Sequence, residues 1–164
     1  MVQIKDYIDV NKKARDLGCN RPLSLTLLPR NFETATSKGE LIHEGNAPTI
    51  RVLLRQNEIS ETKLEEEGEK FPCVQEKSFV EWIAPAIFIS ADLLQENSII
   101  VSVIINIISN YLTDWLRGIP INSRKVRLSI VLETKNGNFK KVEYEGPQDG
   151  LKELPEVIKR VSDE

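Results

Sequence analysis

Apolar and polar residues alternate with a period of two in four segments of the chain, as they do in strands that bury one face. The first of these segments ends at Pro29, and Asn136-Gly137 between the last two suits a tight type I′ turn. We therefore expect the last two segments to pair as a hairpin. The predicted strands are residues 23–28, 50–55, 126–133 and 139–145.

A long apolar helix is predicted between the second and third of these strands. Asn97 is a suitable N-cap and Gly118 a suitable terminator, and the residues between them would span roughly 30 Å as a helix. Isoleucine and valine leave only a narrow polar stripe, so this helix must be covered on most sides. Because β-branched residues lower helix propensity, a pair of strands around 99–108 is the alternative.

A closing helix is predicted after the break at residues 146–150. Its apolar residues recur at helical spacing, and Pro155 fits the first position of the regular part, after one preceding turn. These elements predict an α+β fold in which a mostly antiparallel sheet packs against one long apolar helix and a C-terminal helix. A chain of 164 residues can bury roughly 70% of its unfolded surface, so residues 1–164 are expected to form a single domain.

The remaining segments are less regular. Residues 1–20 are polar and predict a short helix or a loosely attached N-terminal arm that ends at Gly18. Residues 60–70 are acidic and nearly without apolar side chains, so we expect a solvated turn of helix that does not pack deeply, with an acidic patch that docks a basic partner as the alternative. Residues 82–89 are apolar but contain Pro85, which leaves strand and helix open on either side of it.

Charge and cysteine content narrow the function classes. Twenty-two basic and 25 acidic residues give a net charge of −3, which argues against dedicated nucleic-acid binding. Cys19 and Cys73 are too few for a disulfide framework, and residues 1–6 lack the features of a secretory signal. A cytoplasmic, bacterial-type protein is therefore expected.

Few residues carry recognisable chemistry. His43 is the only histidine, and no other histidine or cysteine lies near it at metal-ligand spacing. No glycine-rich phosphate-binding motif occurs. We therefore predict no catalytic residue, no metal and no cofactor. A small enzyme of unrecognised type is the alternative, with Cys19 or Cys73 as a nucleophile if folding brings either beside His43.

Aromatic and basic residues predict a possible interaction surface at the end of the long helix and on the hairpin. The basic residues of the hairpin are expected to gather at one end of it, as an anion contact or as an ordinary solvated face. The predicted surface comprises Trp115, Arg117, Arg124, Lys125, Arg127, Lys140 and Lys141. A membrane-associated helical hairpin over residues 82–116 is a further alternative, which Asp92, Glu96 and Asp114 make costly.

Three short motifs within residues 98–161 resemble a known family. Trp115-Leu116-Arg117 closes the long helix, Val126-Arg127-Leu128 begins a strand, and Val142-Glu143-Tyr144 lies on the returning strand. In this order they resemble the effector-associated constant components, small accessory proteins found beside effectors in bacterial conflict and signalling systems. The resemblance implies a non-catalytic accessory role and supplies no catalytic residue. We therefore expect an adaptor that binds another protein or a second copy of itself.

Overall fold

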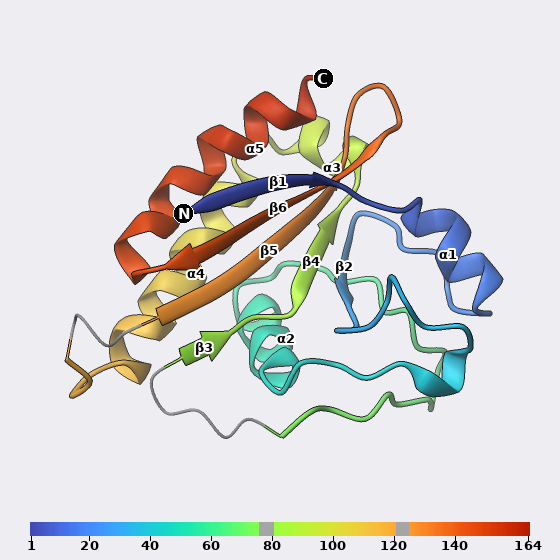
Figure 1. The fold of residues 1–164 in the computed structure, drawn as a ribbon, viewed down its shortest axis with the longest axis horizontal. Helices are drawn as coiled ribbons and strands as arrows, with labels where there is room; N and C mark the ends of the chain where they lie inside the picture. Colours follow the sequence, from blue (N-terminus) through green and yellow to red (C-terminus); the bar gives the residue numbers. More distant parts are fainter. Residues whose placement is uncertain (76–80, 121–124) are drawn as a thin grey trace.

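In residues 1–75, 81–120 and 125–164, which the computed structural model describes, six strands form one mixed sheet (Figure 1). This sheet and the helices packed on it confirm the α+β class predicted from the sequence. The strands are β1 (Val2–Asp6), β2 (Leu25–Leu28), β3 (Glu81–Ile83), β4 (Ala86–Ile89), β5 (Lys125–Glu133) and β6 (Phe139–Gly146).

The strand order is β1-β6-β5-β4-β2, with β3 beside the first part of β5. β1 with β6, β6 with β5 and β4 with β2 are antiparallel, whereas β3 and β4 run parallel to β5. β2, β5 and β6 confirm three of the four predicted strands. The hairpin forms, but its turn is not the predicted type I′ turn, which requires positive φ at both Asn136 and Gly137. Of these two residues only Gly137 is left-handed, with a φ of 80°, and its N–H closes the turn by donating to the Thr134 carbonyl at 2.9 Å.

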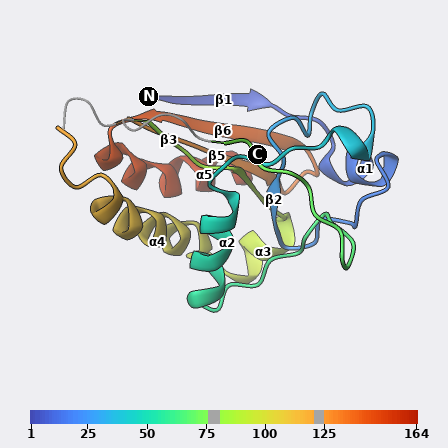
Figure 2. The ribbon, with the colours of Figure 1, turned by 90° about the horizontal axis from the view of Figure 1, so that it is seen from below.

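Helices of the described chain cover one face of the sheet, as the view in Figure 2 shows. They are α2 (Ala47–Gln56), α3 (Ala91–Glu96), α4 (Ile100–Trp115) and α5 (Leu154–Ser162). The closing helix is confirmed, because a short 3-10 helix, η3 (Gln148–Glu153), leads into α5. Pro155 lies in the first turn of α5, where its missing N–H leaves no helical hydrogen bond unmade.

α4 is the long apolar helix that the sequence predicts, so the alternative of two strands around 99–108 is wrong. Parallel pairing of β4 with β5 requires a crossover connection, and α4 lies within it. Four of its isoleucine side chains, those of Ile100, Ile104, Ile105 and Ile108, are buried in the main apolar core, and this burial outweighs the propensity cost of β-branching. Asn106 and Asn110 lie on the exposed polar stripe.

The strand predicted at residues 50–55 is wrong, because these residues belong to α2. Ile50 and Leu54, one helical turn apart, are buried in the core that includes α4, whereas Val52 between them is 40% exposed. Pro48 lies in the first turn of the helix, which favours this start. A short apolar segment fits the periodicity of a strand and that of a helix, and here packing against α4 favours the helix.

The first twenty residues form a strand and a helix. β1, which the sequence does not predict, pairs with β6 along its whole length. The helix α1 (Val10–Asp16) begins after Asp9, whose carboxylate accepts a hydrogen bond from the Lys12 N–H at 3.0 Å. It ends before Gly18, as expected from the sequence. The sequence does not predict β1 because four of its five residues are exposed and its side chains are mostly polar, so no strand pattern of buried residues arises.

Residues 82–89 lie in the strands β3 and β4, on the two sides of Pro85. The break is local, because the Ala84 N–H still donates to the Arg127 carbonyl at 2.9 Å. The helical hairpin considered for residues 82–116 therefore does not form. Among the described residues, no helix combines the length and the hydropathy that a bilayer crossing requires.

A second apolar cluster covers part of the opposite face of the sheet, over β2, β4 and the end of β5. It gathers side chains from α1, from residues 28–41 and from residues 64–71. The loop between Phe32 and Leu41 includes one 3-10 turn, η1 (Lys38–Glu40). The rest of this face, over β5, β6 and β1, has no helix on it (Figures 1 and 2).

The acidic segment 60–70 contributes to this second cluster. Leu64 is fully buried, so the expectation that the segment does not pack deeply is wrong. Two backbone hydrogen bonds hold it: the Thr62 N–H donates to the Leu25 carbonyl at 2.8 Å, and the Asn20 N–H donates to the Leu64 carbonyl at 2.9 Å. One buried leucine and two main-chain hydrogen bonds are sufficient to hold this segment against the second cluster. Neither kind of contact leaves a periodic pattern in the sequence.

Candidate functional site

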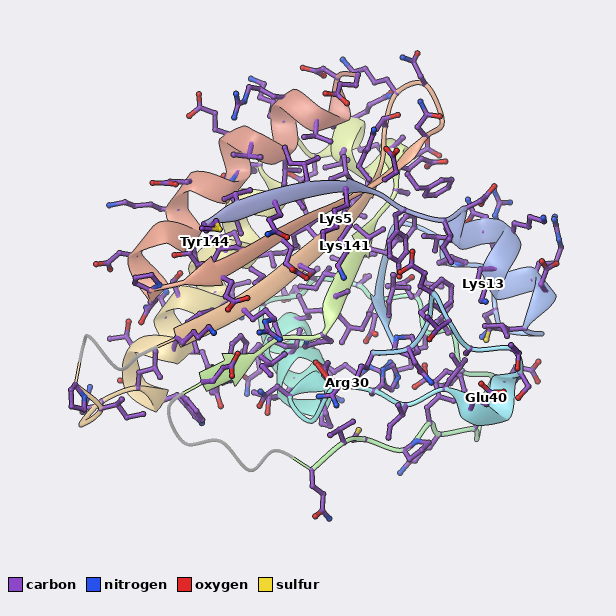
Figure 3. All side chains as sticks on the ribbon, viewed as in Figure 1. Lys5, Lys13, Arg30, Glu40, Lys141 and Tyr144 are labelled. Atoms are coloured by element: carbon purple, nitrogen blue, oxygen red, sulfur yellow. The ribbon has the colours of Figure 1, made fainter. Side chains whose placement is uncertain are left out.

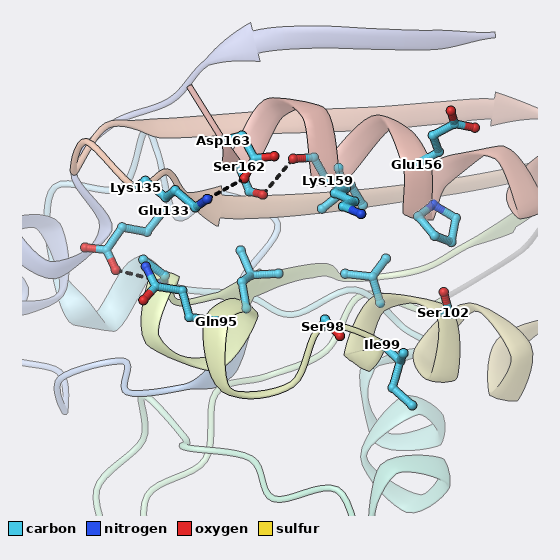
Figure 4. A pocket seen from close by; sticks show the side chains of 15 residues that line it. Gln95, Ser98, Ile99, Ser102, Glu133, Lys135, Glu156, Lys159, Ser162 and Asp163 are labelled. Atoms are coloured by element: carbon cyan, nitrogen blue, oxygen red, sulfur yellow. Dashed lines mark hydrogen bonds and ion pairs between the residues drawn. The ribbon is translucent and has the colours of Figure 1, made fainter.

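A groove opens between α5 and the corner where α3 meets α4 (Figure 4). Its volume is about 780 Å³, and side chains from α3, α4, α5 and the end of β5 line it. α4 and α5 pack together on the same face of the sheet, so both walls rest on the main core. The groove is thus a rigidly supported surface feature.

Apolar side chains form the floor of the groove. Val101 and Ile158 are buried there, and Leu94 is half-buried. Ile99, at the start of α4, is 61% exposed, and its N–H donates to the Asn97 side-chain oxygen at 3.3 Å. An exposed isoleucine beside an apolar floor is the kind of surface that a protein interface buries.

The rim of the groove carries both paired and unpaired charges. Lys135 forms an ion pair with Asp163 at 2.8 Å, and this hydrogen bond lowers the pKa of the Asp163 carboxyl. Glu156 and Lys159, on the exposed side of α5, form no ion pair with any other described residue. The groove can therefore accept an apolar side chain and still offer one free charge of each sign.

The residues of the predicted interaction surface are not brought together. Lys125 and Arg127 lie on the open face near one end of the hairpin, and Lys141 lies on the same face nearer the turn. Figure 3 shows Lys141 beside Lys5, its partner across the β1–β6 pair. Lys140 is at the turn end and alternates to the other face, because successive residues of a strand point to opposite sides.

Each of the described basic residues on the hairpin has an acidic partner. Arg127 lies 3.3 Å from both Glu81 and Glu145, and Lys125 also pairs with Glu145. Lys141 lies 3.5 Å from Glu143 and Lys140 pairs with Asp6. These contacts compensate the basic charge, which favours the interpretation as an ordinary solvated face over a strong anion site.

The other predicted surface residues lie at the end of α4 and just beyond it. Trp115 is half-buried against the main core, so most of its ring is unavailable for stacking on a ligand. Arg117 is exposed and pairs with Asp114 at 2.8 Å. Arg124 lies outside the described residues.

A second cleft, of about 1190 Å³, lies beside α2 and the acidic segment 60–70. Arg51 donates to Glu61 at 3.0 Å and to both oxygens of Glu65 at 2.9 and 3.2 Å. His43 Nε2 lies 3.3 Å from Glu65, and His43 is 1% exposed. Burial acts to raise the pKa of Glu65, but hydrogen bonds from His43 and Arg51 and the charge of Arg51 outweigh it and lower the pKa to about 2.

The cysteines do not complete a nucleophilic pair with His43 in the described parts of the chain. Cys73 and His43 are neighbours in an isolated parallel bridge, in which the His43 N–H donates to the Pro72 carbonyl at 2.8 Å. No hydrogen bond joins their side chains, and Cys73 is exposed. Burial is the main cause that raises the pKa of the half-buried Cys19 thiol. No group of three or more histidine, cysteine or acidic residues with metal-binding geometry occurs among the described residues.

The sequence predicted neither the groove beside α5 nor the buried Glu65 of the second cleft. The groove depends on how α5 lies against α3 and α4, and no local pattern reports that. Glu65 stands among neighbouring glutamates that are exposed, so nothing in the sequence marks it as the buried one.

Comparison with protein-family models, with curated proteins and with solved structures finds no match for the chain.

Proposed function

We propose that this protein is a non-catalytic accessory module that acts by binding another protein in the groove between α5 and the α3–α4 corner. The observation that carries the proposal is the apolar floor of the groove with the exposed Ile99 at its edge. Burying one such side chain at an interface contributes about 2 kcal/mol. The resemblance to bacterial effector-associated components agrees with such a role, in a cytoplasmic defence or signalling system.

The charges on the rim define the chemistry of the partner. Glu156 and Lys159 lie on one exposed side of α5, three residues apart, so they are neighbours on the helix surface. A fitting segment carries an apolar side chain for the floor, with a basic residue facing Glu156 and an acidic residue facing Lys159. Such pairing sets orientation and specificity more than affinity.

The proposal is tested by site-specific crosslinking in the cells that produce the protein. A photoreactive phenylalanine analogue at position 99 is expected to capture one discrete partner, and Lys159→Glu is expected to abolish the adduct. The matched control places the analogue at Val52, an exposed apolar position on α2 outside the groove. Equal adducts from the two positions, or an adduct indifferent to charge reversal, would contradict the proposal.

Binding of the captured partner provides the quantitative test. Ile99→Asp is expected to raise the dissociation constant of the complex roughly thirtyfold, a loss typical of a central anchor residue. Val52→Asp is expected to leave it within about twofold of the wild-type value. Isothermal titration with purified partner measures both values. Equal loss in the two variants would show that the groove is not the binding site.

A further inference from the structure

The two edges of the sheet differ in how they are covered. At one edge, all four residues of β2 are buried, and the Thr62 N–H donates to the Leu25 carbonyl at 2.8 Å. At the other edge, β1 pairs only with β6 among the described strands, and four of its five residues are exposed. A bare edge is a row of unpaired backbone groups that another strand can use.

The hydrogen bonds at the ends of β1 show which groups point outward. The Met1 and Glu145 backbones exchange two hydrogen bonds, at 3.0 and 3.1 Å, and the Tyr7 N–H donates to Phe139 at 2.9 Å. In an antiparallel pair, alternate residues bond to the neighbouring strand, so the odd-numbered residues face β6. The N–H and carbonyl groups of Val2, Ile4 and Asp6 therefore point away from the sheet.

We propose that two copies of this chain associate through β1, which pairs antiparallel with β1 of the second copy around a two-fold axis at Ile4. In this register Ile4 faces Ile4 of the second copy, and Val2 faces Asp6. All outward groups then find partners, in about six hydrogen bonds. The two sheets join into one continuous sheet, and the interface is self-complementary, as two-fold symmetry requires.

Side chains favour this register over its neighbours. Ile4 is 50% exposed, and the two copies of it bury each other across the axis. Lys5 lies opposite Gln3 of the second copy. A shift of the axis to Lys5 places like charges opposite each other, and a shift to Gln3 loses about two hydrogen bonds. A two-fold axis between two residues would place the outward backbone groups of one copy opposite residues of the other copy whose backbone groups already bond to β6.

This interface is independent of the proposed partner groove, because none of the residues of β1 lines it. The occupant is a second copy because β1 satisfies its own outward backbone groups in one register and places no like charges opposite each other there. A strand of an unrelated protein has no such constraint, and it would leave the purified chain monomeric.

Sedimentation equilibrium tests the association. The purified chain is expected to be dimeric at micromolar concentration, and Ile4→Pro is expected to raise the dimer dissociation constant at least tenfold. Ile4→Pro removes only an outward N–H, so the hydrogen bonds to β6 remain. Ile4→Val keeps the N–H and is the matched control, with a change within about threefold. A wild-type monomer at 0.1 mM, or equal weakening by both variants, would overturn the proposal; circular dichroism checks the fold of each.

Disulfide trapping tests the register without relying on stability. In a Cys19→Ser, Cys73→Ser background, Ile4→Cys is expected to crosslink with itself under mild oxidation, because residues facing each other in a sheet lie within disulfide reach. Gln3→Cys alone and Lys5→Cys alone are expected to remain uncrosslinked, whereas their mixture crosslinks. Self-crosslinking of Gln3→Cys with none by Ile4→Cys would contradict the axis at Ile4.

Discussion

At the scale of single residues, the most constrained group is the ionic cluster of His43, Arg51 and Glu65. Two nitrogens of Arg51 hold both oxygens of Glu65, and His43 approaches the same carboxylate. Glu65 is 7% exposed, so its charge depends on these partners in place of water. The cluster ties α2 to the acidic segment 60–70 and so fixes one wall of the second cleft.

Replacing this carboxylate is expected to change how stability depends on pH. The pKa of Glu65 falls from 4.5 to about 2 on folding, so its contribution is fully present above pH 4.5 and disappears as pH falls toward 2. Glu65→Gln is expected to lower the free energy of unfolding by about 2 kcal/mol at pH 7. The difference from wild type should shrink below pH 4, measured by urea denaturation across the pH range.

Glu67→Gln is the matched control, because Glu67 is an exposed acid of the same segment. Its effect on the free energy of unfolding should stay within about 0.5 kcal/mol at every pH. A loss in Glu65→Gln that does not vary between pH 7 and pH 2.5 would argue against an ionised, buried Glu65.

At the scale of elements, α4 organises the helical layer. It connects two parallel strands and packs against α2, α5 and η3, while its amide side chains face solvent. This explains why an element of poor intrinsic propensity is the longest helix among the described residues. Tertiary burial stabilises it, because most helical stability in proteins comes from packing of an apolar face.

Truncation at the centre of this packing should be costly. Leu112 is fully buried near the end of α4, and Leu112→Ala is expected to reduce the free energy of unfolding by about 3 kcal/mol through lost burial and a cavity. Asn110→Ala, on the exposed stripe of the same helix, is the control and should be neutral or slightly stabilising. Chemical denaturation of both variants tests whether α4 is packed as described.

At the scale of the whole molecule, β5 lies at the centre of the sheet. It has β6 along one side and β3 followed by β4 along the other, and both apolar clusters contain its side chains. The second cluster is smaller, and the segments that form it are mostly loops. Stability is therefore expected to be uneven across the molecule.

Native-state hydrogen exchange should report this difference. Amides of β5, such as those of Ile130 and Leu132, are expected to exchange only through global unfolding, because these residues have strand partners on both sides and are buried. Amides of α1 should exchange at least tenfold faster, through opening of the second cluster alone. Equal protection in α1 and β5 would show that the two clusters unfold as one unit.

Much of the architecture follows from local pattern. The hairpin β5–β6 and the closing helix with Pro155 in its first turn each combine a periodicity with a glycine or proline signal, so the two kinds of signal agree. For α4 the apolar pattern predicted the helix, whereas Ile99, and not the predicted Asn97, is its N-cap. Residues 50–55 had no such second signal, because an apolar pattern over only six residues fits both the strand period of two and the helical period of 3.6. β1 had no signal, because a strand held by its backbone at an edge needs few apolar side chains.

The sequence by itself indicated the α+β class, the apolar helix and the hairpin, since each leaves a periodic pattern along the chain, although burial against other elements is what stabilises the helix. Only the tertiary structure decided the parallel pairing of β3 and β4 with β5, the burial of Glu65 against Arg51, the groove beside Ile99 and the bare edge of β1. Each of these joins segments far apart in the chain. Their contacts depend on the packing of whole elements, which no periodicity records.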